Sequence, residues 1–294
     1  MVGFCNGIIT AMITPFTADG VNFEEFGKMI EYQIDGGADG LVILGTTGEP
    51  ATMTEDEKTE VIEYSVKKAA GRIKIIVGTG SNDTAKAVAA TKRAESLGAD
   101  GVLAVTPYYN KCTQKGLYEY YKAICGAVKI PVIAYNVPSR TAVNILPETV
   151  EKLADIPNMA GIKEASGNMA QACETMRRIR GKIDLFSGED FLNLPMLAIG
   201  GAGLISVTSN IAPALVKKMY DLVKENKLDE ANAVQDYLLP LEDACFLEVN
   251  PIPVKAAYNM IGFDAGVPRA PLTELEPHNK EILLREIKRV GLAK

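Results

Sequence analysis

A short pattern recurs along the chain and constrains its fold more than any other feature of the sequence. Residues 37–46, GADGLVILGT, return as GADGVLAVT at 98–106 and, in a weaker copy, as GAGLISVT at 201–208. Each copy is a glycine-bounded apolar run that ends in small polar residues. Continuous apolar runs of this length are typical of strands buried on both faces, as in a parallel sheet.

Similar apolar runs lie elsewhere in the chain, at residues 8–13, 73–77, 132–135, 159–162 and 183–186. Helical patterns separate the runs. Residues 83–97 have helical spacing, and Pro147 and Pro213 stand where a first helical turn accepts proline. Eight strand–helix units predict a (β/α)8 TIM barrel over residues 1–224. A doubly wound open sheet is the alternative, but no GxGxxG motif opens the first unit.

The strand-like runs stop near residue 225. Helical spacing continues over residues 228–245, 254–261 and 283–290. No Ser/Gly-rich linker precedes these segments. We therefore expect residues 225–294 to form a C-terminal helical extension that packs on the barrel.

Composition excludes several classes of function. The net charge of -6 argues against a nucleic-acid partner. No apolar stretch approaches membrane-spanning length and no signal-peptide pattern opens the chain, so we expect a cytoplasmic protein. The five scattered cysteines indicate reduced thiols. With His278 as the single histidine, we expect no metal and no cofactor, and proton transfers by Tyr, Lys, Glu or Asp.

Lys163 closes an apolar run, an unusual position for a lysine. Burial disfavours the ammonium form and favours an amine that can attack a carbonyl. Tyr135 ends the preceding strand, and consecutive barrel strands are neighbours, so we expect the two side chains to meet as a nucleophile and a proton shuttle. The alternatives are a lysine whose ammonium reaches water and a tyrosine that plugs the barrel.

Other strand ends carry further candidates. GTTGE at 45–49 is either a tight turn or an anion cradle of backbone N–H groups. Arg140 is either a solvated charge or a fork for a substrate carboxylate. Tyr108 and Tyr109 either cap the barrel or fill a subunit contact.

Six motifs together carry a family resemblance: GTTGE (45–49), PYYN (107–110), YNVPSRT (135–141), GIKEASG (161–167), SGED (187–190) and NPIPVK (250–255). The chain resembles the pyruvate-dependent class I aldolase and lyase family, which includes N-acetylneuraminate lyase, and within it the dihydrodipicolinate synthases. The resemblance extends from Gly7 to the C-terminal helices.

The resemblance implies a pyruvate Schiff base on Lys163, with Tyr135 as proton donor and acceptor. It also implies a proton relay formed by Tyr135, Thr47 and Tyr109. In the family, the tyrosine that matches Tyr109 reaches the neighbouring subunit's site. A homo-oligomer is therefore implied, a tight dimer paired into a tetramer.

Substrate contacts are implied for five positions. Thr46 and Thr47 would hold the pyruvate carboxylate, and Arg140 the carboxylate of the aldehyde. Gly188 and Ile205 match pocket-lining positions whose backbone groups face the substrate.

The implied reaction is the condensation of pyruvate with L-aspartate 4-semialdehyde to 4-hydroxy-tetrahydrodipicolinate, the first committed step of the diaminopimelate and lysine pathway. Arg140 and Thr46 favour this branch, since sialic acid lyases commonly have serine at the latter position. The alternatives are a pyruvate aldolase for a sugar acid or sialic acid, and a non-catalytic ligand-binding barrel.

Regulation is expected to differ from that of lysine-inhibited family members. At the positions that bind lysine in those proteins, this chain has Pro50, Glu55, Lys58 and Lys86, while Asn82 and Tyr108 are retained. Lys86 would repel the ammonium groups of lysine, so we expect weak or absent feedback inhibition.

Overall fold

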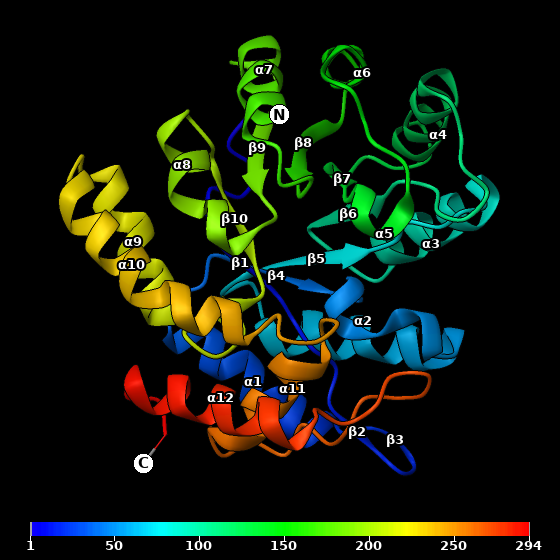
Figure 1. Ribbon diagram of the computed structural model, residues 1–294. Coiled ribbons are helices and arrows are strands. Elements are labelled where there is room, and N and C mark those ends of the chain that lie inside the picture. Colours follow the sequence, from blue (N-terminus) through cyan, green and yellow to red (C-terminus); the bar gives the residue numbers. More distant parts are fainter. Residues whose placement is uncertain (1, 294) are drawn as a thin grey trace.

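Eight parallel strands close into a barrel in the computed structural model, which describes residues 2–293 (Figure 1). Around the barrel the order is β1-β10-β9-β8-β7-β6-β5-β4. The predicted (β/α)8 barrel is therefore confirmed, and the open sheet is wrong. The barrel strands are β1 (Gly7–Ala11), β4 (Gly40–Ile43), β5 (Lys74–Gly78), β6 (Gly101–Val105), β7 (Val132–Asn136), β8 (Met159–Glu164), β9 (Asp184–Ser187) and β10 (Gly203–Ser206).

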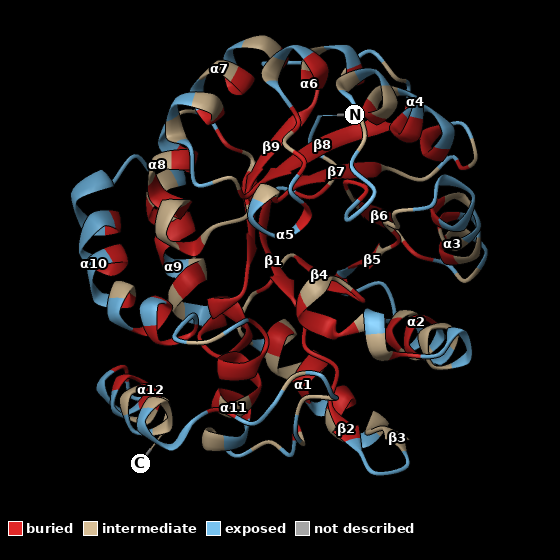
Figure 2. Ribbon diagram, turned by 45° about the vertical axis from the view of Figure 1, so that its right-hand side comes forward, coloured by how far each residue is buried: buried red, intermediate tan, exposed pale blue. Residues whose placement is uncertain are grey.

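Helices surround the barrel, and Figure 2 shows the strands buried inside their ring. They are α1 (Phe23–Asp35), α2 (Glu55–Ala69), α3 (Thr84–Ser96), α4 (Gln114–Cys125), α6 (Pro147–Leu153), α7 (Met169–Ile179), α8 (Asn193–Ala198) and α9 (Pro213–Lys224). Pro147 and Pro213 stand at first helical positions, as predicted. Thr54 and Glu57 form a capping box that starts α2.

Short elements lie in the loops that follow the strands. They are the hairpin β2 (Phe16–Thr17) and β3 (Gly20–Val21), the single-turn helix α5 (Pro138–Thr141), and the 3-10 turns η1 (Thr46–Gly48), η2 (Pro50–Thr52), η3 (Asp190–Leu192) and η4 (Thr208–Asn210).

Side-chain alternation along the strands creates two apolar clusters. Ile9, Ile133 and Ile205 belong to the cluster inside the barrel, whereas Ile8 and Ile162 pack in the larger cluster that includes the helices. Because Ile162 faces the helices, the next side chain on β8 faces the barrel interior.

Three helices follow the barrel: α10 (Leu228–Ala244), α11 (Ile252–Met260) and α12 (Pro277–Arg289). Figure 1 shows α10 alongside α9, with α11 and α12 near α1. Gln33 Nε2 of α1 donates to the Tyr258 hydroxyl of α11 over 3.2 Å. The predicted barrel segment (1–224) begins at Met1 and the predicted extension (225–294) ends at Lys294, and these two residues lie outside the described ones. None of the helices in residues 2–293 is long and apolar enough to cross a membrane.

Candidate active site

Lys163 and Tyr135 lie side by side at the carboxyl ends of β8 and β7. They are register partners in the parallel ladder, and Lys163 Nζ lies 4.4 Å from the centroid of the Tyr135 ring. Their exposed fractions are 5% and 7%. Within the described residues Lys163 forms no ion pair. The sequence-predicted pairing of amine and phenol is therefore present, in a buried and aromatic environment.

Gly188, just after β9, leaves room for the lysine. A Cβ atom at this position would lie 2.8 Å from Lys163 Cε. The Gly188 N–H donates to the Glu164 carbonyl over 2.8 Å, so this N–H already has a partner. Burial raises the pKa of the adjacent Glu189, as does Asp190, while Lys163 opposes the shift. Sequence reasoning missed Glu189 as a charge close to the lysine.

The turn after β4 carries Thr46 and Thr47. The N–H groups of Gly48 and Glu49 close it by donating to the carbonyls of Gly45 and Thr46. The N–H groups of Thr46 and Thr47 have no partner within residues 2–293, as expected at the start of a helical turn. They remain available for an anion.

Asn250 joins two predicted substrate-binding residues and was missed by sequence reasoning, although it opens the NPIPVK motif. Its Nδ2 donates to Thr47 Oγ1 over 2.9 Å, and its backbone carbonyl accepts from Arg140 Nη2 at 3.2 Å. The side chain is buried, and Oδ1 has no partner in the described chain. The loop between α10 and α11 therefore reaches the barrel mouth.

A second buried lysine lies behind the same turn. Lys255 Nζ of α11 lies 2.7 Å from Glu49 Oε1, and both side chains are almost fully buried. Burial lowers the pKa of Lys255, while Glu49 opposes that shift. Sequence reasoning did not identify this pair.

Two of the predicted site residues, Tyr109 and Arg140, are exposed, unlike Lys163 and Tyr135. Tyr109, on the loop after β6, is 93% exposed and has a left-handed backbone with φ 69°. Within residues 2–293, no hydrogen bond joins it to Thr47 or Tyr135. Arg140 is exposed on α5, and Ile205 is buried in the barrel interior.

Comparison with known proteins matches residues 4–290 to the dihydrodipicolinate synthetase family. The chain belongs to this family. The 4-hydroxy-tetrahydrodipicolinate synthase of Caldicellulosiruptor bescii is 47% identical over 284 residues, which cover 96% of each chain. The dihydrodipicolinate synthase structure from Aquifex aeolicus superposes with a TM-score of 0.95 at 44% identity, covering 98% of both chains.

One further solved family structure is described as a monomeric dihydrodipicolinate synthase variant. It is 39% identical, with a TM-score of 0.96, and the match covers 99% of this chain and 100% of that one. Family membership and the barrel geometry therefore agree over nearly the whole chain.

Proposed function

We propose that this protein condenses pyruvate with L-aspartate 4-semialdehyde to give 4-hydroxy-tetrahydrodipicolinate. The observation that carries the proposal is Lys163, which is buried 4.4 Å from the Tyr135 ring centroid at the barrel mouth and has no ion-pair partner among residues 2–293. The activity named for the Caldicellulosiruptor bescii relative supports it.

The chemistry starts with attack of the Lys163 amine on the pyruvate ketone, whose oxygen leaves as water. The resulting imine draws electrons from the methyl group, which loses a proton to give an enamine. The enamine carbon bonds to the aldehyde carbon, and the aldehyde oxygen gains a proton. The amino group of the second substrate then attacks the imine carbon and releases the lysine, so one water is lost overall.

Roles for the remaining residues follow from their positions. Tyr135 donates and accepts the protons of imine formation, with Thr47 as the next group of the relay. The N–H groups of Thr46 and Thr47, which have no partner in the described part of the chain, hold the pyruvate carboxylate. Arg140, anchored on the Asn250 carbonyl, holds the carboxylate of the aldehyde.

Two residues shape the pocket in this proposal. Gly188 gives Lys163 its space, and Ile205 closes the barrel below the reacting carbons.

We also propose that Tyr109 completes the relay of a neighbouring subunit in a tight dimer, paired into a tetramer in the cytoplasm. Its 93% exposure in the single chain supports a contact with another chain, since a ring this exposed has little to pack against.

Reductive trapping tests the Schiff base directly. Borohydride added with pyruvate should attach one pyruvic acid less one oxygen to Lys163 and block tryptic cleavage there, giving an intact 153–177 peptide. Lys163→Ala should lose the adduct, and the Lys255 peptide of the same digest should stay unmodified. An unmodified Lys163 in folded protein would refute the mechanism.

Aldehyde choice separates the proposed reaction from other pyruvate aldolases. Rapid pyruvate consumption should require L-aspartate 4-semialdehyde. If pyruvate is trapped on Lys163 but consumed only with a sugar-derived aldehyde, the protein is a pyruvate aldolase of the sugar-acid or sialic-acid type.

Feedback by lysine is proposed to be weak. Glu55 already pairs with Lys58 at 2.7 Å and with Arg93, and Lys86 is exposed on α3. Pro50 has no backbone N–H and no polar side-chain group to offer a ligand. Turnover should therefore be unaffected by millimolar lysine, and strong inhibition at that concentration would contradict this.

A further inference from the structure

The turn that carries Thr46 and Thr47 is held in an unfavourable backbone conformation. Leu44, before the turn, has φ 55°, and Glu49, after it, has φ 56°. Left-handed backbone is disfavoured for residues with a Cβ atom, so it persists only where the surroundings enforce it. Something outside the turn must therefore hold both ends.

Gly78 explains how Leu44, at the start of the turn, is held. A Cβ atom on this β5 residue would lie 2.1 Å from the Leu44 carbonyl oxygen, so only glycine lets the two backbones approach.

The second end is held by the C-terminal extension. Glu49 Oε1 lies 2.7 Å from Lys255 Nζ, and Glu49 Oε2 accepts the Arg269 backbone N–H over 2.8 Å. Lys255 Nζ also lies 4.1 Å from the Phe16 ring centroid. The Lys255 side chain is 0% exposed and the Glu49 side chain 2% exposed. Neither group can reach solvent or substrate.

Burial of two charges is costly even when they pair. A pair of apolar residues of similar size often gives a fold equal or greater stability. The proposed reaction gives neither group a chemical step. A fixed distance between α11 and the turn is the property that this pair provides and that apolar packing would not.

We propose that the Glu49–Lys255 ion pair positions the turn whose Thr46 and Thr47 N–H groups receive the pyruvate carboxylate, which makes the C-terminal extension a part of the pyruvate site. Asn250 adds a second link from the same extension, through Thr47 Oγ1. This inference rests on the proposed function and adds positioning residues to it, not catalytic ones.

The test measures the pyruvate concentration that half-saturates borohydride trapping on Lys163, which needs no second substrate. Lys255→Met should raise this concentration about tenfold, the effect of losing one well-placed interaction. It should also lower Tm, because Glu49 is left charged and unpaired.

The double variant Glu49→Gln/Lys255→Met separates positioning from stability. It buries no unpaired charge, and the new amide oxygen still accepts the Arg269 N–H, so Tm should recover. The half-saturating concentration should stay raised, because the link from α11 to the turn is gone. Arg289→Met, which removes the 2.6 Å pair with Glu286 on α12, is the matched control and should leave pyruvate binding unchanged.

The outcomes are distinct. The positioning role is wrong if the folded double variant has the half-saturating pyruvate concentration of the parent. It is also wrong if that concentration returns towards the parent value to the same degree as Tm. Lys255→Arg gives a second measurement if Lys255→Met does not fold: it keeps a positive charge beside Glu49, so its half-saturating pyruvate concentration should stay closer to that of the parent than in the double variant. If the parent protein does not trap pyruvate, the proposed function itself is contradicted, and not only the positioning role.

Discussion

At the scale of single residues, the direction of one hydrogen bond matters for proton transfer. Asn250 Nδ2 is a donor, so Thr47 Oγ1 accepts this bond and keeps its own proton for another acceptor. In the proposed relay, that acceptor is Tyr135 or the Tyr109 of a neighbouring subunit. Asn250 therefore sets which way the Thr47 hydroxyl points.

Asn250→Asp should reverse this bond, because a carboxylate accepts and the Thr47 hydroxyl must then donate to it. We expect turnover to fall by about tenfold or more with the fold retained, since a positioned proton donor contributes factors of this size or larger. Steady-state kinetics with circular dichroism checks this. Asn259→Asp, which alters an amide farther along α11, is the control, and equal losses in both variants would contradict the argument.

A second residue-scale prediction concerns a buried acid. Glu242 on α10 is fully buried, with Oε2 accepting from Gln235 Nε2 at 2.8 Å and Oε1 without a partner in the described chain. Burial raises its pKa to about 9, from 4.5. The folded state thus keeps a proton that the unfolded chain releases, so this stabilisation is complete below about pH 4.5 and is lost as pH rises towards 9.

Glu242→Gln stays neutral at every pH. It should match the parent near pH 4 and exceed it at pH 8 by about 5 kcal/mol in unfolding free energy. Denaturant unfolding at the two pH values measures the difference. Parallel pH profiles of parent and variant would show that Glu242 titrates normally.

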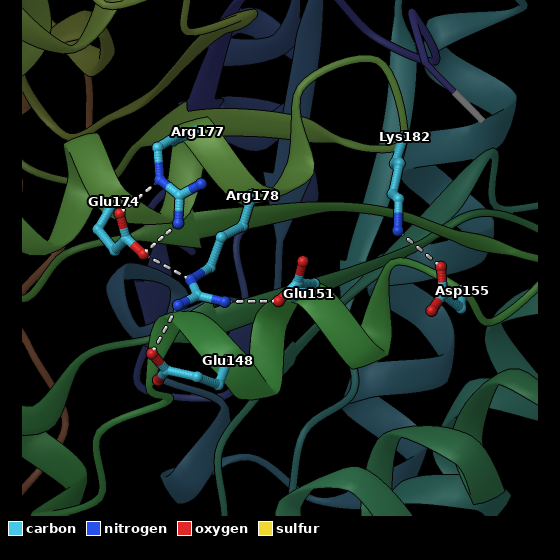
Figure 3. A network of polar contacts seen from close by, with 7 residues as sticks. All are labelled: Glu148, Glu151, Asp155, Glu174, Arg177, Arg178 and Lys182. Atoms are coloured by element: carbon cyan, nitrogen blue, oxygen red, sulfur yellow. Dashed lines mark hydrogen bonds and ion pairs between the residues drawn. The ribbon is translucent and has the colours of Figure 1, made fainter.

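At the scale of secondary-structure elements, a charged network joins α6 to α7 (Figure 3). Arg178 of α7 contacts Glu174 on its own helix at 2.7 Å, and Glu151 and Glu148 of α6 at 2.6 and 3.0 Å. Arg177, one residue earlier, pairs with Glu174. Arg178 therefore ties two helices together, whereas Arg177 acts within one.

Arg178→Met should lower Tm by more than Arg177→Met does, and the difference should shrink in high salt because these charges are near the surface. The two arginines hold the pKa of Glu174 at about 2, below its usual 4.5. The contribution of that carboxylate is complete above pH 4.5 and is lost as pH falls towards 2. Equal effects of the two substitutions on Tm would exclude the cross-helix role.

At the scale of the whole molecule, we propose that a second chain completes the active site. Lys163, Tyr135 and Thr47 are buried in one barrel, but Tyr109 stands exposed at its rim. If Tyr109 acts in the neighbouring subunit, each site draws residues from two chains.

Mixed dimers test this arrangement. Lys163→Ala and Tyr109→Phe should each be weakly active alone, and mixing them under subunit exchange should restore activity, because one site of each hybrid has both residues. Sedimentation velocity confirms that hybrids can form. No gain on mixing, in a preparation that exchanges subunits, would place the action of Tyr109 within its own chain.

The sequence by itself determined the barrel and the central pair of the site. Each apolar run carries its own strand signal, and the alternation with helices allows a closed parallel sheet. The closeness of Tyr135 and Lys163 follows from that order alone, because they end consecutive strands and consecutive strands pair. The division of the chain into a barrel unit, residues 1–224, and a C-terminal extension, residues 225–294, stays a prediction.

Only the tertiary structure decided how the turn at 45–49 is held. Asn250 meets Thr47 across 203 positions of sequence, and Lys255 meets Glu49 across 206. No local pattern encodes such contacts, because they depend on where the helices after the barrel pack. The sequence shows which chemical groups the protein has, and the packing of α11 against the barrel decides which of them meet.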